Sequence, residues 1–61
     1  MSQSSDANRF RVVTSPYYAI RPGAIGLLVR KEFVHSSLEA WVIDFGKLGK
    51  WHFFPSEVAP V

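Results

Sequence analysis

The chain has 61 residues, enough for one small domain with a modest apolar core, and 48% of them are hydrophobic. It has no cysteine and only two histidines, which excludes disulfides and an ordinary structural zinc site, so its stability should come from apolar packing. The net charge is only +2, and the chain has no polybasic run, no apolar stretch long enough to cross a membrane and no signal-peptide pattern. We therefore expect a soluble, cytoplasmic protein without a cofactor, with a disordered polar tail over residues 1–8 and one folded domain over residues 9–61.

The first strand is predicted over Arg9–Thr14, where apolar Phe10 and Val12 alternate with arginines, as in a half-buried strand. Pro16 ends this strand, because proline lacks the N–H that the ladder needs and restricts the residue before it. A long first loop is then expected over residues 15–25.

A turn is predicted near the end of that loop, at Pro22-Gly23, because proline presets φ at the second turn position and glycine accepts a positive φ at the third. Gly26 then allows a close backbone approach or a kink where the second strand starts. This strand is predicted over Leu27 to about Phe33. It begins apolar on both faces and becomes amphipathic, which is typical of a strongly bent strand that serves both halves of a barrel.

Residues 34–38 are expected to form a polar connection to the third strand. A short helix is the alternative, with Ser36 as N-cap and Glu39 at the capping-box position. We favour the connection, because the aromatic and β-branched run that begins at Trp41 leaves such a helix no room.

The third strand is predicted over Glu39–Phe45, and alternation divides its side chains between two faces. One face would carry Trp41, Ile43 and Phe45, and the other would carry Ala40, Val42 and Asp44. We expect Ile43 and Phe45 to be core, which would leave Val42 on the outside, and for Trp41 a place in the core and a partner contact are equal alternatives.

A glycine-flanked hairpin loop over residues 46–49 leads to a fourth strand, predicted over Lys50–Phe54. Alternation directs Trp51 and Phe53 to the core, and Lys50, His52 and Phe54 outward, and for Trp51 a partner contact is an equal alternative. Pro55–Glu57 should form a 3₁₀ turn before a short last strand over Val58–Val61. Pro60 confines that strand to an edge or to its terminus.

This order of elements resembles the SH3-like small barrels. Three segments carry the resemblance: Pro22–Leu28 is similar to the diverging turn and the glycine-marked entry of the second strand, Trp41–Gly46 to the central strand, and Phe53–Val58 to the closing segment. The resemblance covers residues 9–61. It implies an all-β, five-stranded SH3-like barrel with a long first loop and a 3₁₀ turn before the last strand.

Peptide-binding members of that family grip polyproline with first-loop tyrosines, nearby acids, a tryptophan in the next loop and a proline at the 3₁₀ turn. Tyr17, Tyr18 and Pro55 match these residues in kind. The first loop has Arg21 but no acid, and residues 34–38 contain no tryptophan. The chain is therefore more similar to the stand-alone adaptors of the family than to its polyproline binders.

Function is predicted to be non-catalytic binding of another protein, as an adaptor, regulator or inhibitor. No Ser, Cys or acid stands at a recognisable spacing from His52 or His35 to form a catalytic triad, so we expect no enzyme and interpret both histidines as surface residues. The predicted contact residues are Tyr17, Tyr18, Arg21, Trp51, Phe54 and Pro55. Val42 and Phe54 would either join the first loop in one exposed apolar surface or be covered by that loop, and both alternatives remain open.

Two other functions are compatible with the sequence. A nucleic-acid binder would contact phosphate through Arg9, Arg11, Arg30, Lys31 and Lys50, with aromatic side chains stacking on bases. The opposing interpretation is a solvated charged face balanced by Glu32, Glu39 and Asp44. A homo-oligomer formed through open strand edges is the third candidate.

Overall fold

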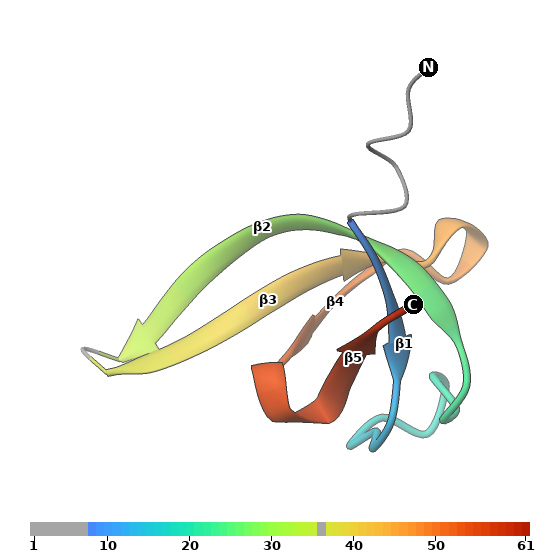
Figure 1. Cartoon of the computed structure of the whole chain (residues 1–61), viewed down its shortest axis with the longest axis horizontal. Coiled ribbons are helices and arrows are strands. Elements are labelled where there is room, and N and C mark those ends of the chain that lie inside the picture. The colour runs from blue at the N-terminus through green and yellow to red at the C-terminus, as the bar shows by residue number, and fades with distance from the viewer. Residues whose placement is uncertain (1–7, 36) are drawn as a thin grey trace.

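The computed structural model of the chain describes residues 8–35 and 37–61, so the predicted tail lies outside the described residues except for Asn8. Five antiparallel strands form one curved sheet in the order β4-β3-β2-β1-β5 (Figure 1). The strands are β1 Arg9–Val12, β2 Ile25–His35, β3 Leu38–Asp44, β4 Lys50–Phe53 and β5 Val58–Pro60, with 3₁₀ turns η1 Gly46–Leu48 and η2 Pro55–Glu57 before the last two. The all-β prediction is confirmed, and the sheet is open, with β4 and β5 as its outer strands. In this part of the chain no helix is long and apolar enough to cross a membrane.

The strand ends differ from the prediction. β1 stops at Val12, because the N–H groups of Val13 and Thr14 both donate to the Glu57 carbonyl, at 2.8 and 3.2 Å, instead of continuing the ladder. The predicted polar connection over residues 34–38 was wrong at both ends, since β2 runs to residue 35 and β3 begins at Leu38. The helical alternative is excluded from Leu38 onward by β3, while its N-cap, Ser36, lies outside the described residues.

Two glycines fix the path into β2, as predicted. Gly23 has a φ of 98°, and the Ala24 N–H donates to the Arg21 carbonyl at 3.0 Å, which closes the Pro-Gly turn. Gly26 lies so close to β3 that a Cβ atom there would be 2.6 Å from Ile43 Cγ2. β2 can therefore cross β3 closely only because Gly26 has no side chain.

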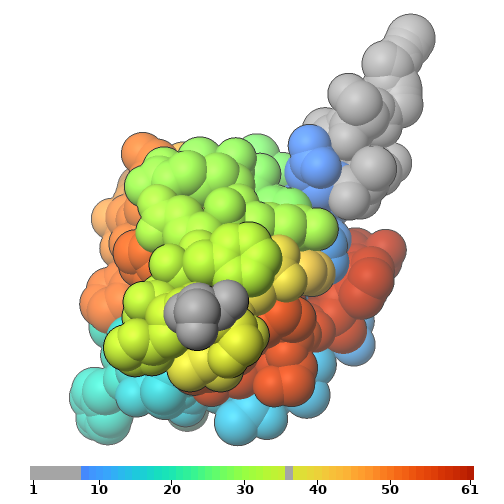
Figure 2. All heavy atoms as spheres, turned by 90° about the vertical axis from the view of Figure 1, so that its left-hand side faces the viewer, coloured from blue at the N-terminus to red at the C-terminus, as the bar shows by residue number. Residues whose placement is uncertain are grey.

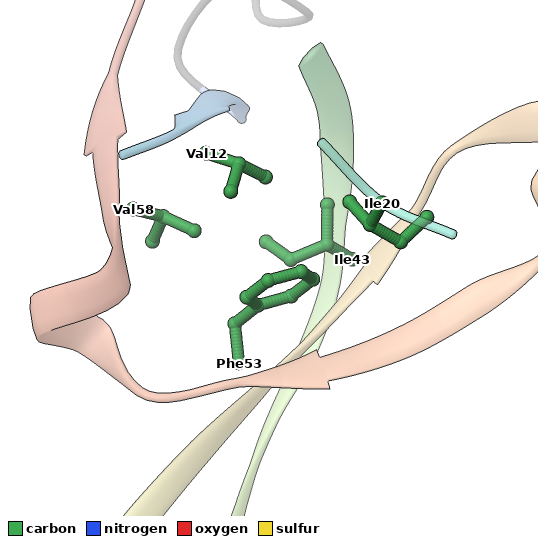
Figure 3. Packing of buried hydrophobic residues seen from close by; sticks show 5 residues of the cluster. All are labelled: Val12, Ile20, Ile43, Phe53 and Val58. Atoms are coloured by element: carbon green, nitrogen blue, oxygen red, sulfur yellow. The ribbon is translucent and has the colours of Figure 1, made fainter. Parts of the chain in front are cut away.

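The core lies inside the curve of the sheet. Its buried side chains are Val12, Ile20, Ile43, Phe53 and Val58 (Figure 3). The predicted core positions Ile43 and Phe53 are confirmed, with exposed fractions of 0% and 2%. Ile20 comes from the first loop, so this loop contributes to the core rather than only connecting two strands.

β3 is buried on both faces at its centre, which the sequence did not predict. Val42 is only 2% exposed, so its predicted place on the outside was wrong. Its cross-strand partners are Arg30 on β2 and His52 on β4, and partners in register share a face. These two side chains therefore lie on the same face as Val42, one on either side of it.

Candidate functional site

A mainly apolar groove opens between the first loop, the β2–β3 hairpin and the end of β4, with a volume of about 360 Å³. We call it the apolar groove. Its apolar lining comes from Pro16, Tyr17, Val34, Ala40, Phe53 and Phe54. Three segments that are distant in sequence thus build its walls, and Ala40, whose side chain is small, leaves room between them.

Tyr17 is the fixed wall of this groove. Its ring lies 4.8 Å from the Trp51 ring and 5.2 Å from the Phe53 ring, measured between centroids. Its hydroxyl donates to the His52 carbonyl at 2.5 Å, and Ser15 Oγ accepts its backbone N–H at 3.1 Å. These contacts fasten the first loop onto β4, so the wall is preorganised before any partner binds.

Phe54 forms the opposite wall and is 43% exposed. Its N–H donates to Glu57 Oε1 at 2.9 Å, and its carbonyl accepts the Glu57 N–H at the same distance. This reciprocal pair holds the start of η2, where Pro55 occupies the first turn, as predicted. Phe54 and Pro55 also line a second hollow of about 500 Å³, together with Leu38.

The rim of the apolar groove carries two carboxylates, Glu32 and Glu57. Glu32 Oε2 accepts a hydrogen bond from Arg30 Nε at 2.5 Å, and Glu32 Oε1 lies 3.0 Å from His52 Nε2. These two hydrogen bonds, that from Arg30 above all, lower the pKa of the Glu32 carboxyl below its ordinary value of 4.5. Glu32 is therefore ionised at neutral pH and paired with Arg30, at the rim of a mainly apolar floor.

The other predicted contact residues lie around this groove rather than in it. Tyr18, which is fully exposed, and Arg21 line a neighbouring hollow of about 570 Å³ whose shared wall is Tyr17. Trp51 is half-buried, packs against Tyr17 and donates from Nε1 to the Leu48 carbonyl at 2.6 Å. Trp51 thus supports the groove wall from behind.

Seven groove residues were absent from the predicted contact set: Pro16, Glu32, Val34, Ala40, His52, Phe53 and Glu57. Glu32 and Ala40 become neighbours only through the register of the β2–β3 hairpin, in which they are direct partners. For Glu57 a signal was present, because an acid two residues after Pro55 is well placed to accept the N–H that precedes the turn.

The basic residues of the nucleic-acid alternative are spread over three strands. Arg9 and Arg11 lie on β1, and Lys50 lies on β4 opposite Asp44. Further along β2, Arg30 donates to Glu32, and Lys31 Nζ lies 4.6 Å from the centroid of the Trp41 ring. The structure therefore does not bring these five residues together into one patch.

Comparisons with protein-family models, with curated proteins and with solved structures found no significant match. The five-stranded sheet is compatible with an SH3-like fold. Among residues 8–35 and 37–61, no three His, Cys, Asp or Glu side chains are grouped so that they could hold a metal ion.

Proposed function

We propose that this protein is a non-catalytic, SH3-like interaction module, an adaptor, regulator or inhibitor, that binds a partner protein in the apolar groove. The observation that carries the proposal is the groove itself, an open, mainly apolar hollow of about 360 Å³ beside a 43% exposed phenylalanine, Phe54. Contiguous exposed apolar surface on a small protein marks a site of interaction.

Barrel-like closure of the sheet is supported by the membership of the core. Val12 and Val58 come from β1 and β5, whereas Ile43 and Phe53 come from β3 and β4. Strands at opposite ends of the sheet order therefore share one core, which requires the sheet to curl over itself. That curl brings the first loop against β4 and so creates the apolar groove.

The lining of the groove defines the chemistry of the partner. An apolar side chain would fill the space between Tyr17 and Phe54, where desolvation contributes most of the binding energy. A Lys or Arg side chain beside it would meet Glu32 or Glu57 on the rim. Tyr18 and Arg21, in the neighbouring hollow, extend the contact surface past Tyr17.

The test is affinity capture from the native source after nuclease treatment, comparing the wild type with Phe54→Ser and with Tyr18→Ala. The matched control is Leu48→Ser, because Leu48 is similarly exposed, at 50%, but lies in η1, outside the groove. We expect Phe54→Ser to weaken partner binding about 30-fold, as for a truncated hot-spot residue, while Leu48→Ser binds like the wild type. Equal recovery by Phe54→Ser and the wild type would contradict the proposal.

Nucleic-acid binding remains the alternative, and its support is that Arg9 and Lys50 share a face of the sheet, through Leu27 and Asp44 in register. This alternative predicts binding to a random oligonucleotide that falls steeply as salt is raised. Absence of any mobility shift at low salt would exclude it.

A further inference from the structure

β2 has a long open edge. β1 pairs only with residues 25–27 of β2, and the Asn8 carbonyl accepts the Leu28 N–H at 2.8 Å. From Val29 to His35 the side of β2 opposite β3 has no partner strand within the described chain, and this stretch runs along the projecting hairpin (Figure 1). An edge of this length offers backbone donors and acceptors to another strand.

The two outer strands of the sheet, by contrast, have backbone hydrogen-bonding groups that are missing or already used. In β5, Pro60 has no N–H, and the Val58 N–H is used by the Pro55 carbonyl. In β4, the His52 carbonyl accepts the Tyr17 hydroxyl. We therefore expect the open edge of β2, rather than β4 or β5, to pair with a strand of another molecule.

We propose that the protein forms a twofold dimer by antiparallel pairing of residues 29–33 of β2 with the same residues of a second copy, with Lys31 at the axis. In such a pair each residue lies opposite the one equally far from the centre. Arg30 then lies opposite Glu32 of the second copy, and Val29 lies opposite Phe33 of the second copy. Each of these pairings occurs twice, once on either side of the axis.

The edge is self-complementary in both apolar surface and charge. Val29 and Phe33 are 43% and 70% exposed, so their pairing removes apolar surface that the monomer leaves in water. Arg30 and Glu32 already form an ion pair within one chain. In the dimer the two ion pairs lie side by side, with each cation next to the carboxylate of the other copy.

In this register Lys31 lies opposite Lys31 of the second copy, which would place two positive charges close together. The observed position of the Lys31 side chain avoids this repulsion. Its Nζ lies over the Trp41 ring of its own chain, toward β3 and away from the open edge. An axis at Arg30 or at Glu32 would also set like charges opposite each other, and it would lose the pairing of Arg30 with Glu32 between the copies and separate Val29 from Phe33. The charges thus select the register centred on Lys31.

The dimer goes beyond the proposed function and does not depend on it. A twofold axis normal to the sheet keeps both copies of each face on the same side. Figure 2, which views the molecule from the left-hand side of Figure 1, shows the yellow-green end of the β2–β3 hairpin facing the viewer. The two apolar grooves would then open toward the same side. A partner with two binding segments could occupy both grooves at once and would bind with higher overall affinity than through one groove.

The first test is sedimentation velocity of the wild type at protein concentrations up to about 1 mM, together with Arg30→Glu and Glu32→Arg. We expect a monomer–dimer equilibrium for the wild type and a dimer dissociation constant about tenfold higher for each variant alone. We expect the dimer to form again when the two variants are mixed. In this register each variant alone sets like charges at both positions, whereas the mixed pair sets opposite charges at both positions. A wild type that stays monomeric, or variants that fail to recover on mixing, would overturn the proposal.

The second test leaves Arg30 and Glu32 unchanged. The chain has no cysteine, so Lys31→Cys introduces a single thiol at the proposed axis, and Lys47→Cys in η1 is the control. We expect Lys31→Cys to form a disulfide-linked dimer about tenfold faster than Lys47→Cys under mild oxidation, since only residue 31 meets its own copy. Equal rates of cross-linking would overturn the proposal.

Discussion

Gly26→Ala gives the sharpest test of how the strands cross. The added methyl would lie 2.6 Å from Ile43 Cγ2, 2.8 Å from the Asp44 carbonyl oxygen and 2.9 Å from Phe45 Cδ1. Ile43 is fully buried, and the Asp44 oxygen belongs to the backbone of β3, so neither can move aside without disturbing the core. Overpacking of this kind costs about 1–3 kcal/mol, and we expect the upper part of that range.

A smaller effect opposes this cost. Replacing glycine by alanine restricts the unfolded chain and stabilises the folded state by about 0.4–1 kcal/mol. The net loss is therefore about 2 kcal/mol, from a total stability of about 3–9 kcal/mol for a domain of this length. We expect the urea midpoint, followed by tryptophan fluorescence, to fall by about 1–2 M.

Gly46→Asn is the control for this experiment. Gly46 has a φ of 75°, which asparagine tolerates better than other residues, and a Cβ there meets nothing within 4 Å. We expect its urea midpoint to stay within about 0.5 M of the wild type. A Gly26→Ala midpoint equal to or above that of the wild type would refute the close approach of β2 and β3.

Three further predictions concern the first loop and the rim of the groove. Ile20→Ala should lower the free energy of unfolding by about 2–5 kcal/mol, because Ile20 is fully buried; an unchanged urea midpoint would show that the loop does not enter the core. Tyr17→Phe should lower it by about 1 kcal/mol and speed amide exchange in the loop, since it removes the hydrogen bond to the His52 carbonyl; unaltered exchange would count against that anchor. The pKa of Glu32 is lowered in the folded state, so its ionised form stabilises the fold above pH 4.5, and this contribution is lost as the pH falls through the folded pKa. Urea midpoints measured from pH 7 to pH 3 should therefore differ between the wild type and Glu32→Gln at neutral pH and converge in acid, and a constant difference would exclude the linkage.

Local chemistry made most of the fold predictable from the sequence. Alternation of apolar and polar residues indicated the strands, and proline and glycine marked the turns at Pro22-Gly23 and Pro55–Glu57, which the structure confirms. Gly26 was predicted to allow a close approach, and it lies against Ile43. Each of these features depends on residues that are near one another in sequence or on the conformational preference of one residue.

The features that were missed depend on contacts between distant segments. Val42 fits an outward position by alternation alone, yet it is buried between its neighbours in register on the flanking strands, Arg30 and His52. Glu32 joins the groove through the register of the β2–β3 hairpin. That register depends on the position of the turn, which was predicted over residues 34–38 and is shorter in the structure. Ile20 is one of several apolar residues in the first loop, and only the curl of the sheet shows why it is the one that is buried.

The most direct test of the central claim is an NMR titration of the ¹⁵N-labelled protein with the captured partner. Binding in the apolar groove predicts that the largest shift changes fall on Tyr17, Val34 and Phe54, which line its walls, while Leu48 in η1 stays unchanged. Shift changes confined to Arg9, Arg11 and Leu27, on β1 and the paired part of β2, would place the partner on another surface and contradict the account.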